Sequence, residues 1–210
     1  MSIVAIVPAA GLSVRMGRPK LTLPLRDKTV IAHVVETLLA GGADRVLCVV
    51  RPHANPESDR LTRETREAGA EVSVCDPPPP DMRASVEHGI ALLEAEMTVP
   101  AGILLCPADS PGLSEALVRQ VTDTFAADPS RLVLPQHSGK RGHPVAIPWD
   151  LALAIRELPM GEGINALHVL HDARRVFLPI TDGAAAFADL DTPQDYQAWQ
   201  ERLESRRPTP

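Results

Sequence analysis

The sequence predicts an α/β fold with a single domain, built as a doubly wound, Rossmann-like and mostly parallel sheet. Short runs rich in Val, Ile and Leu alternate with segments whose apolar residues recur at helical spacing. The short runs are apolar at nearly every position, which is typical of strands that helices cover on both faces. A chain of 210 residues, of which 44 % are hydrophobic, is long enough to bury one such core.

The first two thirds of the chain show this alternation most clearly, because the helical segments begin or end at recognisable signals. Gly41-Gly42 and Gly69 close two of the helices, and Ser114 has a side chain suited to an N-cap. The expected strands are 2–7, 45–50, 71–75, 102–106 and 131–134. The expected helices are 30–39, 58–68, 83–97 and one from Ser114 to about Ala127.

The last third of the chain is less regular. Its expected strands are 144–148, 175–180 and 186–190, and its expected helices are 149–158, 164–171 and a last one opened by Thr192, Pro193 and Asp195. Residues 1–203 then form the domain and residues 204–210 a frayed tail. Doubly wound sheets bind ligands at the carboxyl ends of their strands, near the switch in strand order. The expected binding loops therefore follow Val7, Cys75 and Cys106.

The composition excludes several classes of partner. The net charge is −6 and the pI about 5.6, so the surface repels nucleic acid and anionic lipid. Aromatic residues make up 3 %, too few for a base-stacking platform. The N-terminal apolar run, about six residues without a basic flank, is too short for a signal sequence or a membrane span. Three cysteines without a C-x-x-C pair predict buried, reduced thiols, and we expect a cytoplasmic protein.

The segment after the first strand carries the clearest chemical signal. Ala9, Ala10 and Gly11 have minimal side chains, so a phosphate can approach their backbone N–H groups closely. Three cations fall within six residues of an otherwise acidic chain: Arg15, Arg18 and Lys20. Arginine offers phosphate a fork of donors, and lysine offers a compact charge. The segment matches neither the dinucleotide pattern G-x-G-x-x-G nor the Walker pattern G-x-x-x-x-G-K-[ST].

The order of these residues, A-A-G-x-S-x-R-M-G-x-x-K, resembles the signature of the MobA-like NTP transferases, and within them of the molybdenum cofactor cytidylyltransferases. Four further stretches resemble elements of that family in the same order. They are 82–86 (G-M-x-x-S-L), 109–113 (D-x-P-x-L), 141–145 (G-H-P-V) and 189–196 (D-I-D-T-P-E-D-Y). The chain departs from the pattern at Asp81, where the family has glycine, and at Asp76, where it usually has asparagine.

The resemblance implies a fold of the nucleotide-diphospho-sugar transferase type and an Mg²⁺-dependent enzyme. That enzyme moves a nucleotidyl group from an NTP to the phosphate of molybdopterin or its metal-loaded form and releases pyrophosphate. The implied nucleotide-binding residues are Ala9, Ala10, Gly11, Ser13, Arg15, Lys20 and Ser85. The implied catalytic residues are Arg15, Lys20 and Asp109, the metal ligands Asp109 and Asp191, and the acceptor residues Gly142, His143 and Pro144. Ala10 stands where the related guanylyltransferases have glycine, which favours CTP over GTP and leaves ATP open.

Other interpretations of these residues stay open. Asp109 suits an Asx turn or N-cap before Pro111, Asp191 suits a helix N-cap, and His143 suits a loop histidine bonded to backbone. The acceptor can instead be a sugar phosphate or polyol phosphate. The chain can also be a non-catalytic factor that holds the cofactor for a molybdenum hydroxylase, its implied client. Asp76 and Asp81 favour that alternative if they keep the triphosphate out.

Overall fold

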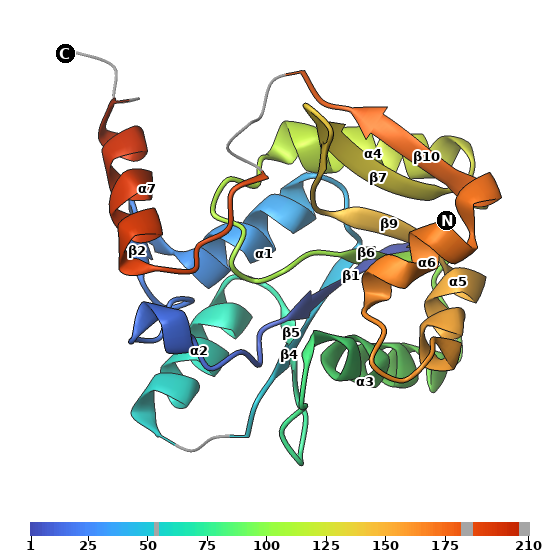
Figure 1. Cartoon of the computed structure of the whole chain (residues 1–210). Helices are drawn as coiled ribbons and strands as arrows, with labels where there is room; N and C mark the ends of the chain where they lie inside the picture. Colours follow the sequence, from blue (N-terminus) through green and yellow to red (C-terminus); the bar gives the residue numbers. More distant parts are fainter. Residues whose placement is uncertain (53–54, 182–186, 206–210) are drawn as a thin grey trace.

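The computed structural model describes residues 1–52, 55–181 and 187–205. Across these residues, eight strands form one mostly parallel sheet, and helices cover both of its faces (Figure 1). The order across the sheet is β10-β7-β9-β6-β1-β4-β5, and β8 pairs with β7. The predicted α/β class and the mostly parallel sheet are confirmed.

The strands lie close to the predicted positions through the first two thirds of the chain. Those of the large sheet are β1 (Ile3–Pro8), β4 (Arg45–Val50), β5 (Glu71–Val74), β6 (Gly102–Leu105), β7 (Leu132–His137), β8 (Lys140–Arg141), β9 (Val145–Pro148) and β10 (Arg175–Pro179). A separate two-stranded ribbon consists of β2 (Pro24–Leu25) and β3 (Lys28–Thr29). The sequence prediction does not include β2, β3 or β8, because two-residue strands leave no periodic pattern.

Several of the helices begin at side-chain caps that the sequence encodes. The helices are α1 (Val30–Ala40), α2 (Pro56–Glu67), α3 (Met82–Glu94), α4 (Glu115–Ala127), α5 (Trp149–Ala154), α6 (Leu167–Leu170) and α7 (Pro193–Ser205). The side chain of Ser114 accepts a hydrogen bond from the N–H of Leu117, so its predicted role as the N-cap of α4 is confirmed. Short 3₁₀ turns are η1 (Val14–Met16), η2 (Ile155–Glu157), η3 (Ile164–Ala166) and η4 (Asp172–Arg174).

The hydrophobic core has two layers, one on each face of the sheet. In β1, Ala5 and Val7 belong to the layer under α1, α4 and α7, whereas Val4 and Ile6 belong to the layer under α3, α5 and α6 (Figure 1). The alternation follows from the period of two along a strand. Because helices bury both faces, a ligand reaches the strands only at their ends.

The strand order changes direction beside β1. From β1 the chain adds β4 and β5 on one side, and then crosses over to place β6 on the other side. The loops that leave β1 and β6 therefore diverge at the carboxyl edge of the sheet, which leaves a crevice between them. The sequence places its small-residue loop after β1 and Asp109 after β6, so the topology brings both to this crevice.

Strand β9 is an exception to the parallel sheet. It runs antiparallel to β6, with Val145 opposite Leu105 and Pro148 opposite Gly102. Its first residue therefore lies at the carboxyl end of β6. This direction brings His143, two residues before β9, to the ligand edge, which a parallel strand would not do.

The C-terminal third departs most from the predicted elements. The helices expected over 149–158 and 164–171 each divide into an α-helix and a 3₁₀ turn. The strand expected over 186–190 is wrong in its described part, because residues 187–190 lie in no strand, and residue 186 lies outside the described residues. Helix α7 continues to Ser205, so the first two residues of the tail expected at 204–210 are helical, and residues 206–210 lie outside the described residues.

Two further expectations concern the membrane and the thiols. Among the described residues, no helix has the length and apolar character needed to cross a bilayer. All three cysteines are free thiols, and Cys48 and Cys106 are buried. Burial raises the pKa of the Cys106 thiol to about 12, so it stays protonated at neutral pH. Cys75 is only partly buried, which the prediction of a core thiol did not anticipate.

Candidate active site

The loop after β1 folds back so that its backbone faces the crevice. The N–H of Ala9 still donates to the carbonyl of Val49 on β4 (2.8 Å), which extends the sheet by one bond. Ser13 then adopts the left-handed conformation (φ 52°), and its hydroxyl accepts a hydrogen bond from the backbone N–H of Lys20 (3.3 Å). That bond closes the loop and returns Lys20 to the edge of the sheet.

Three amide groups of this loop have no protein acceptor. In the described part of the chain, the N–H groups of Ala10, Gly11 and Leu12 donate to no backbone or side-chain oxygen. A Cβ added at Gly11 would meet no heavy atom within 4 Å, so packing within the protein does not explain the glycine there. Unpaired N–H groups beside open space form the kind of backbone concavity that binds phosphate oxygens.

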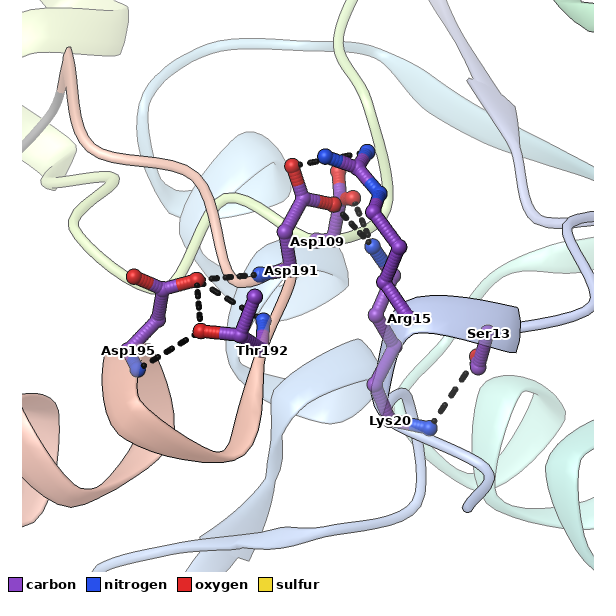
Figure 2. A network of polar contacts seen from close by, with 7 residues as sticks. All are labelled: Ser13, Arg15, Lys20, Asp109, Asp191, Thr192 and Asp195. Atoms are coloured by element: carbon purple, nitrogen blue, oxygen red, sulfur yellow. Dashed lines mark hydrogen bonds and ion pairs between the residues drawn. The ribbon is translucent and has the colours of Figure 1, made fainter. Parts of the chain in front are cut away.

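Lys20 lies between two carboxylates (Figure 2). Its Nζ is 2.5 Å from Oδ2 of Asp109 and 3.0 Å from Oδ1 of Asp191. Arg15 reaches the other oxygen of Asp191, with its Nη2 at 2.9 Å from Oδ2. Burial lowers the pKa of Lys20, but the bonds to Asp109 and Asp191 outweigh it, so that the pKa is raised and the ammonium stays charged.

Asp191 is held in place by the first turn of α7. The hydroxyl of Thr192 accepts from the N–H of Asp195 (3.2 Å), and Oδ2 of Asp195 accepts from the N–H of Thr192 (2.7 Å). This reciprocal pair is a capping box, and Oδ2 of Asp195 also accepts from the N–H of Asp191 (3.1 Å; Figure 2). Thr192 therefore caps the helix, and the carboxylate of Asp191 is left to contact Lys20 and Arg15. Asp195 serves local structure, as its position in the sequence suggests.

Asp109 is held beside Asp191 by the backbone. The N–H of Leu190 donates to the carbonyl of Asp109 (3.3 Å), which joins the loop after β6 to the segment before α7. A third acid, Asp189, lies nearby, and burial followed by the charges of Asp109 and Asp191 raises its pKa. The carboxylates are therefore crowded enough to repel one another, and Lys20 and Arg15 supply the compensating charge.

A cavity of about 380 Å³ lies over these residues, and we call it the first cavity. Every residue that the family resemblance implies for nucleotide or metal binding lines it: Ala9, Ala10, Gly11, Ser13, Arg15, Lys20, Ser85, Asp109 and Asp191. The structure thus brings together residues that are up to 182 positions apart in the sequence. Their individual roles in binding and catalysis remain predictions.

The start of α3 forms the side of the first cavity opposite the loop. Ser85 is buried there, and its hydroxyl donates to the carbonyl of Asp81 (3.2 Å). The carboxylate of Asp81 caps α3 by accepting from the N–H of Ala84 (2.8 Å), so the helix N-terminus partly compensates its charge. Asp76 is exposed and does not line the cavity. Neither acidic departure from the family pattern therefore leaves an uncompensated carboxylate buried in the cavity.

A larger second cavity, about 820 Å³, adjoins the first. The two share Pro80, Asp81 and Met82 in their walls. The second cavity is lined mainly by apolar side chains of β6, β7 and β9 and of the 3₁₀ turns and loops that follow α5: Leu105, Leu132, Leu134, Val145, Ile147, Leu158, Ile164 and Leu167. A planar or partly apolar group fits such walls better than a small, fully hydroxylated one.

His143 is the one predicted acceptor residue that lines the second cavity. Its Nδ1 lies 3.3 Å from the carbonyl oxygen of Leu105, which can only accept, so Nδ1 carries the proton. Burial lowers the pKa of His143, and the backbone bond and the charges of Asp189 and Asp109 compensate only partly. The ring is therefore neutral at pH 7, with Nε2 as a hydrogen-bond acceptor.

Gly142 and Pro144 do not line the second cavity, and their implied roles in acceptor binding remain predictions. Both are buried, and a Cβ added at Gly142 would overlap the ring of Phe187. Phe187 also packs against His137, with ring centroids 5.7 Å apart. The small size of Gly142 thus admits the aromatic side chain that covers this turn, and only its neighbour His143 faces the cavity.

The sequence prediction missed Arg51, which also lines the first cavity. Arg51 follows the last residue of β4, and its Nη1 donates to the carbonyl of Ala10 (3.3 Å). Arg51 could have been predicted from the sequence, because it follows a strand beside β1 and every parallel strand ends at the same edge of the sheet. Arg18, the third cation of the segment, does not line the cavity, and its guanidinium lies 5.2 Å from the ring centroid of Tyr196 on α7.

The chain is similar to known proteins along most of its length. The model of the MobA-like NTP transferase domain matches residues 5–176, which is most of the chain. The chain belongs to the MobA-like NTP transferase family. The matched range includes the loop after β1, Ser85, Asp109 and His143, but it ends before Asp191.

Two curated relatives of this family member have different acceptors in their names. The 2-C-methyl-D-erythritol 4-phosphate cytidylyltransferase of Shewanella amazonensis is 36 % identical over 129 residues, which are 50 % of this chain and 54 % of the relative. The molybdenum cofactor cytidylyltransferase of Escherichia coli is 23 % identical over 199 residues, which are 94 % of this chain and 95 % of the relative. The match spans about half the length of the first relative and nearly all of the second.

Solved structures place this MobA-like chain among nucleotidyltransferases of the nucleotide-diphospho-sugar transferase fold. A nucleotidyl transferase from Methanothermobacter thermautotrophicus is 22 % identical, with a TM-score of 0.78 over 98 % of this chain and 99 % of that one. A manganese complex of Rv0371c from Mycobacterium tuberculosis is 21 % identical, with a TM-score of 0.69 over 96 % of this chain and 99 % of that one. At these identities the likeness shows the fold alone.

Proposed function

We propose that this protein is a cytidylyltransferase that moves the CMP group of CTP to the phosphate of an acceptor and releases pyrophosphate. One observation carries the proposal: Lys20 joins Asp109 and Asp191 at a cavity that is also lined by the unpaired N–H groups of the loop after β1. The loop offers donors to a polyphosphate, the two cations offer charge, and the two carboxylates offer ligands to a metal. Family membership supports this assignment.

The two carboxylates suit Mg²⁺ that arrives with a triphosphate. Within the described residues, no group of three or more His, Cys, Asp or Glu side chains could hold a metal ion by itself. Two carboxylates are nevertheless the usual protein contribution where substrate phosphates and water complete an octahedral Mg²⁺. Asp109 and Asp191 would hold the ion, which would neutralise charge on the reacting phosphates. A manganese complex with the same fold is consistent with a divalent metal in this family.

The reaction needs no covalent enzyme intermediate. An oxygen of the acceptor phosphate attacks the α-phosphorus of CTP, the bond from the α-phosphorus to the α–β bridging oxygen breaks, and pyrophosphate leaves. The enzyme's part is to align the two phosphates and to stabilise charge on the leaving group. Lys20 and Arg15 would stabilise the charge on the leaving pyrophosphate. The carboxylates that they contact in this structure would turn to the metal when MgCTP binds.

We assign the acceptor to the second cavity and propose a molybdopterin-type phosphate. The cavity is about twice the volume of the first and largely apolar, which suits a pterin ring better than a short polyol chain. The molybdenum cofactor cytidylyltransferase of Escherichia coli is also a relative that matches almost end to end. A cytoplasmic location and a molybdenum hydroxylase as client belong to the same proposal.

A polyol phosphate is the second candidate acceptor. The 36 % identity to a methylerythritol phosphate cytidylyltransferase over half the chain favours it. Polar groups in the second cavity, among them Asn165 and the neutral His143, could bind hydroxyls. The size of the cavity is the argument against this candidate.

A pyrophosphate-release assay separates the candidates. The protein would be incubated with Mg²⁺, each of the four NTPs, and either molybdopterin or 2-C-methyl-D-erythritol 4-phosphate. Release with CTP and molybdopterin supports the proposal, and release only with the polyol phosphate selects the second candidate. If no pair released pyrophosphate and MgCTP did not raise the Tm, nucleotidyl transfer would be refuted and a non-catalytic binding factor favoured.

A further inference from the structure

Arg83 connects two parts of the second cavity that are far apart in the sequence. It lies in the first turn of α3, and its guanidinium donates to four backbone carbonyls of the segment after α5. They are those of Leu158 (2.9 Å), Pro159 (3.0 Å), Glu162 (3.2 Å) and Arg156 (3.3 Å). The remaining donor, Nε, is 2.7 Å from Oε1 of Glu87, one turn further along α3. The side chain is 17 % exposed.

The segment that Arg83 binds forms part of the wall of the second cavity. Residues 158–163 join η2 to η3 without regular structure, and all except Pro159 line the cavity. Leu158 is buried in the core, but beyond it Gly161 takes a positive φ (87°) and Met160 is fully exposed, so residues 159–163 pack little apolar surface. Its internal bonds are the turn bonds from Leu158 N–H to Ile155 and from Glu162 N–H to Pro159. Such a segment depends on outside contacts for a fixed position.

The same turn of α3 also serves the first cavity. Met82 and Ser85, on either side of Arg83, line the first cavity, whereas Arg83 and Glu87 line the second. The segment lines only the second cavity, so a change in its position relative to α3 changes the width of the second cavity. An arginine suits this role because its planar group holds five donors in a fixed fork, whereas lysine has one nitrogen.

We infer that Arg83 is a positioning residue that sets the width of the second cavity and thereby selects the acceptor. The inference rests on the proposed function in one respect, namely that the acceptor occupies the second cavity. Arg83 does not line the first cavity, so its loss should leave nucleotide binding intact. Without the hydrogen bonds of Arg83, the segment that lines the second cavity would be free to move, and the acceptor would bind there less tightly.

The test replaces Arg83 by lysine, which keeps the charge and can keep the pair with Glu87. Arg60→Lys is the matched control, because Arg60 makes the same Nε to Oε1 pair with Glu64 on α2 (2.6 Å), away from both cavities. For Arg83→Lys we expect the acceptor KM to rise about tenfold, with kcat and the Kd of MgCTP changed less than about twofold. Arg60→Lys should stay near the wild type.

Hydrogen exchange provides a readout that needs no turnover. In Arg83→Lys the amides of Leu158 and Glu162 should exchange about tenfold faster than in the wild type, with the amides of β1 and β4 unchanged. Unchanged exchange at these two amides would overturn the inference, and so would equal losses in MgCTP and acceptor binding. If the wild type turned over no acceptor, the proposed function would fail by itself. The exchange result would still decide whether Arg83 holds the wall.

Discussion

The two cavities share one turn of α3, yet their other walls differ in chemistry. The first cavity, about 380 Å³, is lined by loops at the ends of β1, β4 and β6 that carry Arg15, Lys20, Arg51 and Asp109. The second, about 820 Å³, is lined mainly by apolar side chains of β6, β7 and β9 and of the segments after α5. The strand ends of a doubly wound sheet thus supply the charges for a polyphosphate. The later, irregular segments supply a surface whose shape selects the second ligand.

Lys20 lines the first cavity and does not line the second. Lys20→Met removes the ammonium that joins the two carboxylates, and we expect pyrophosphate release to fall about 10²- to 10³-fold, or roughly 3–4 kcal/mol. Lys28→Met is the control, because Lys28 pairs with Glu36 on the exposed surface. Steady-state rates with saturating acceptor measure the effect. Turnover near that of the wild type in Lys20→Met would remove this residue from the reaction.

Gly142 tests whether the turn before β9 has a structural role. Gly142→Ala places a Cβ against the ring of Phe187, so we expect the free energy of unfolding to fall by about 1–3 kcal/mol. Urea denaturation measures the loss. Phe187→Ala in the same chain should recover part of it, because the overlap is relieved. An additive double variant would show that the two residues do not interact in solution.

Gly11 lines the first cavity, so its replacement tests whether MgCTP binds in that cavity. A Cβ at Gly11 meets no protein atom, so Gly11→Ala should leave the Tm within about 1 °C while weakening MgCTP binding about tenfold, or 1.4 kcal/mol. Gly163→Ala is the matched control, since Gly163 also has open space around it but lines the second cavity. Isothermal titration with MgCTP gives both affinities. Equal affinities of Gly11→Ala and Gly163→Ala for MgCTP would contradict the assignment of the nucleotide to the first cavity.

The smallest expected effect is that of His143 on the pH dependence of the unfolding free energy. Its pKa is lowered in the fold, chiefly by burial, so the folded protein resists protonation more than the unfolded chain does. Its contribution to stability is therefore present above its ordinary pKa and is lost as the pH falls below it. The fall in unfolding free energy between pH 8 and pH 5 should be smaller in His143→Gln than in the wild type. Equal falls would contradict a neutral, buried ring.

The sequence predicts the first cavity better than the second, for a physical reason. The residues of the first cavity follow buried parallel strands, whose apolar runs are easy to recognise and all end at one edge. The pattern of apolar runs therefore suffices to place Lys20 and Asp109 at the same edge. Arg51 was within reach of the same argument, because it follows β4 directly.

The second cavity depends on features that no local pattern encodes. The antiparallel direction of β9, which brings His143 to the edge, comes from pairing with β6 and β7. The segment held by Arg83 has no periodicity, and its position comes from contacts with a helix more than 70 residues earlier. The close approach of Gly142 to Phe187 is likewise a tertiary contact that no local pattern reveals.

The direct test of the central claim is the effect of Mg²⁺ on CTP binding. Isothermal titration would compare CTP with and without Mg²⁺ for the wild type and for Asp109→Asn, which keeps the size of the side chain but removes its charge. We predict that Mg²⁺ strengthens CTP binding to the wild type at least about tenfold, and that most of this gain is lost in Asp109→Asn. An equal Mg²⁺ effect in both proteins, or none in the wild type, would contradict a metal-bound triphosphate in the first cavity.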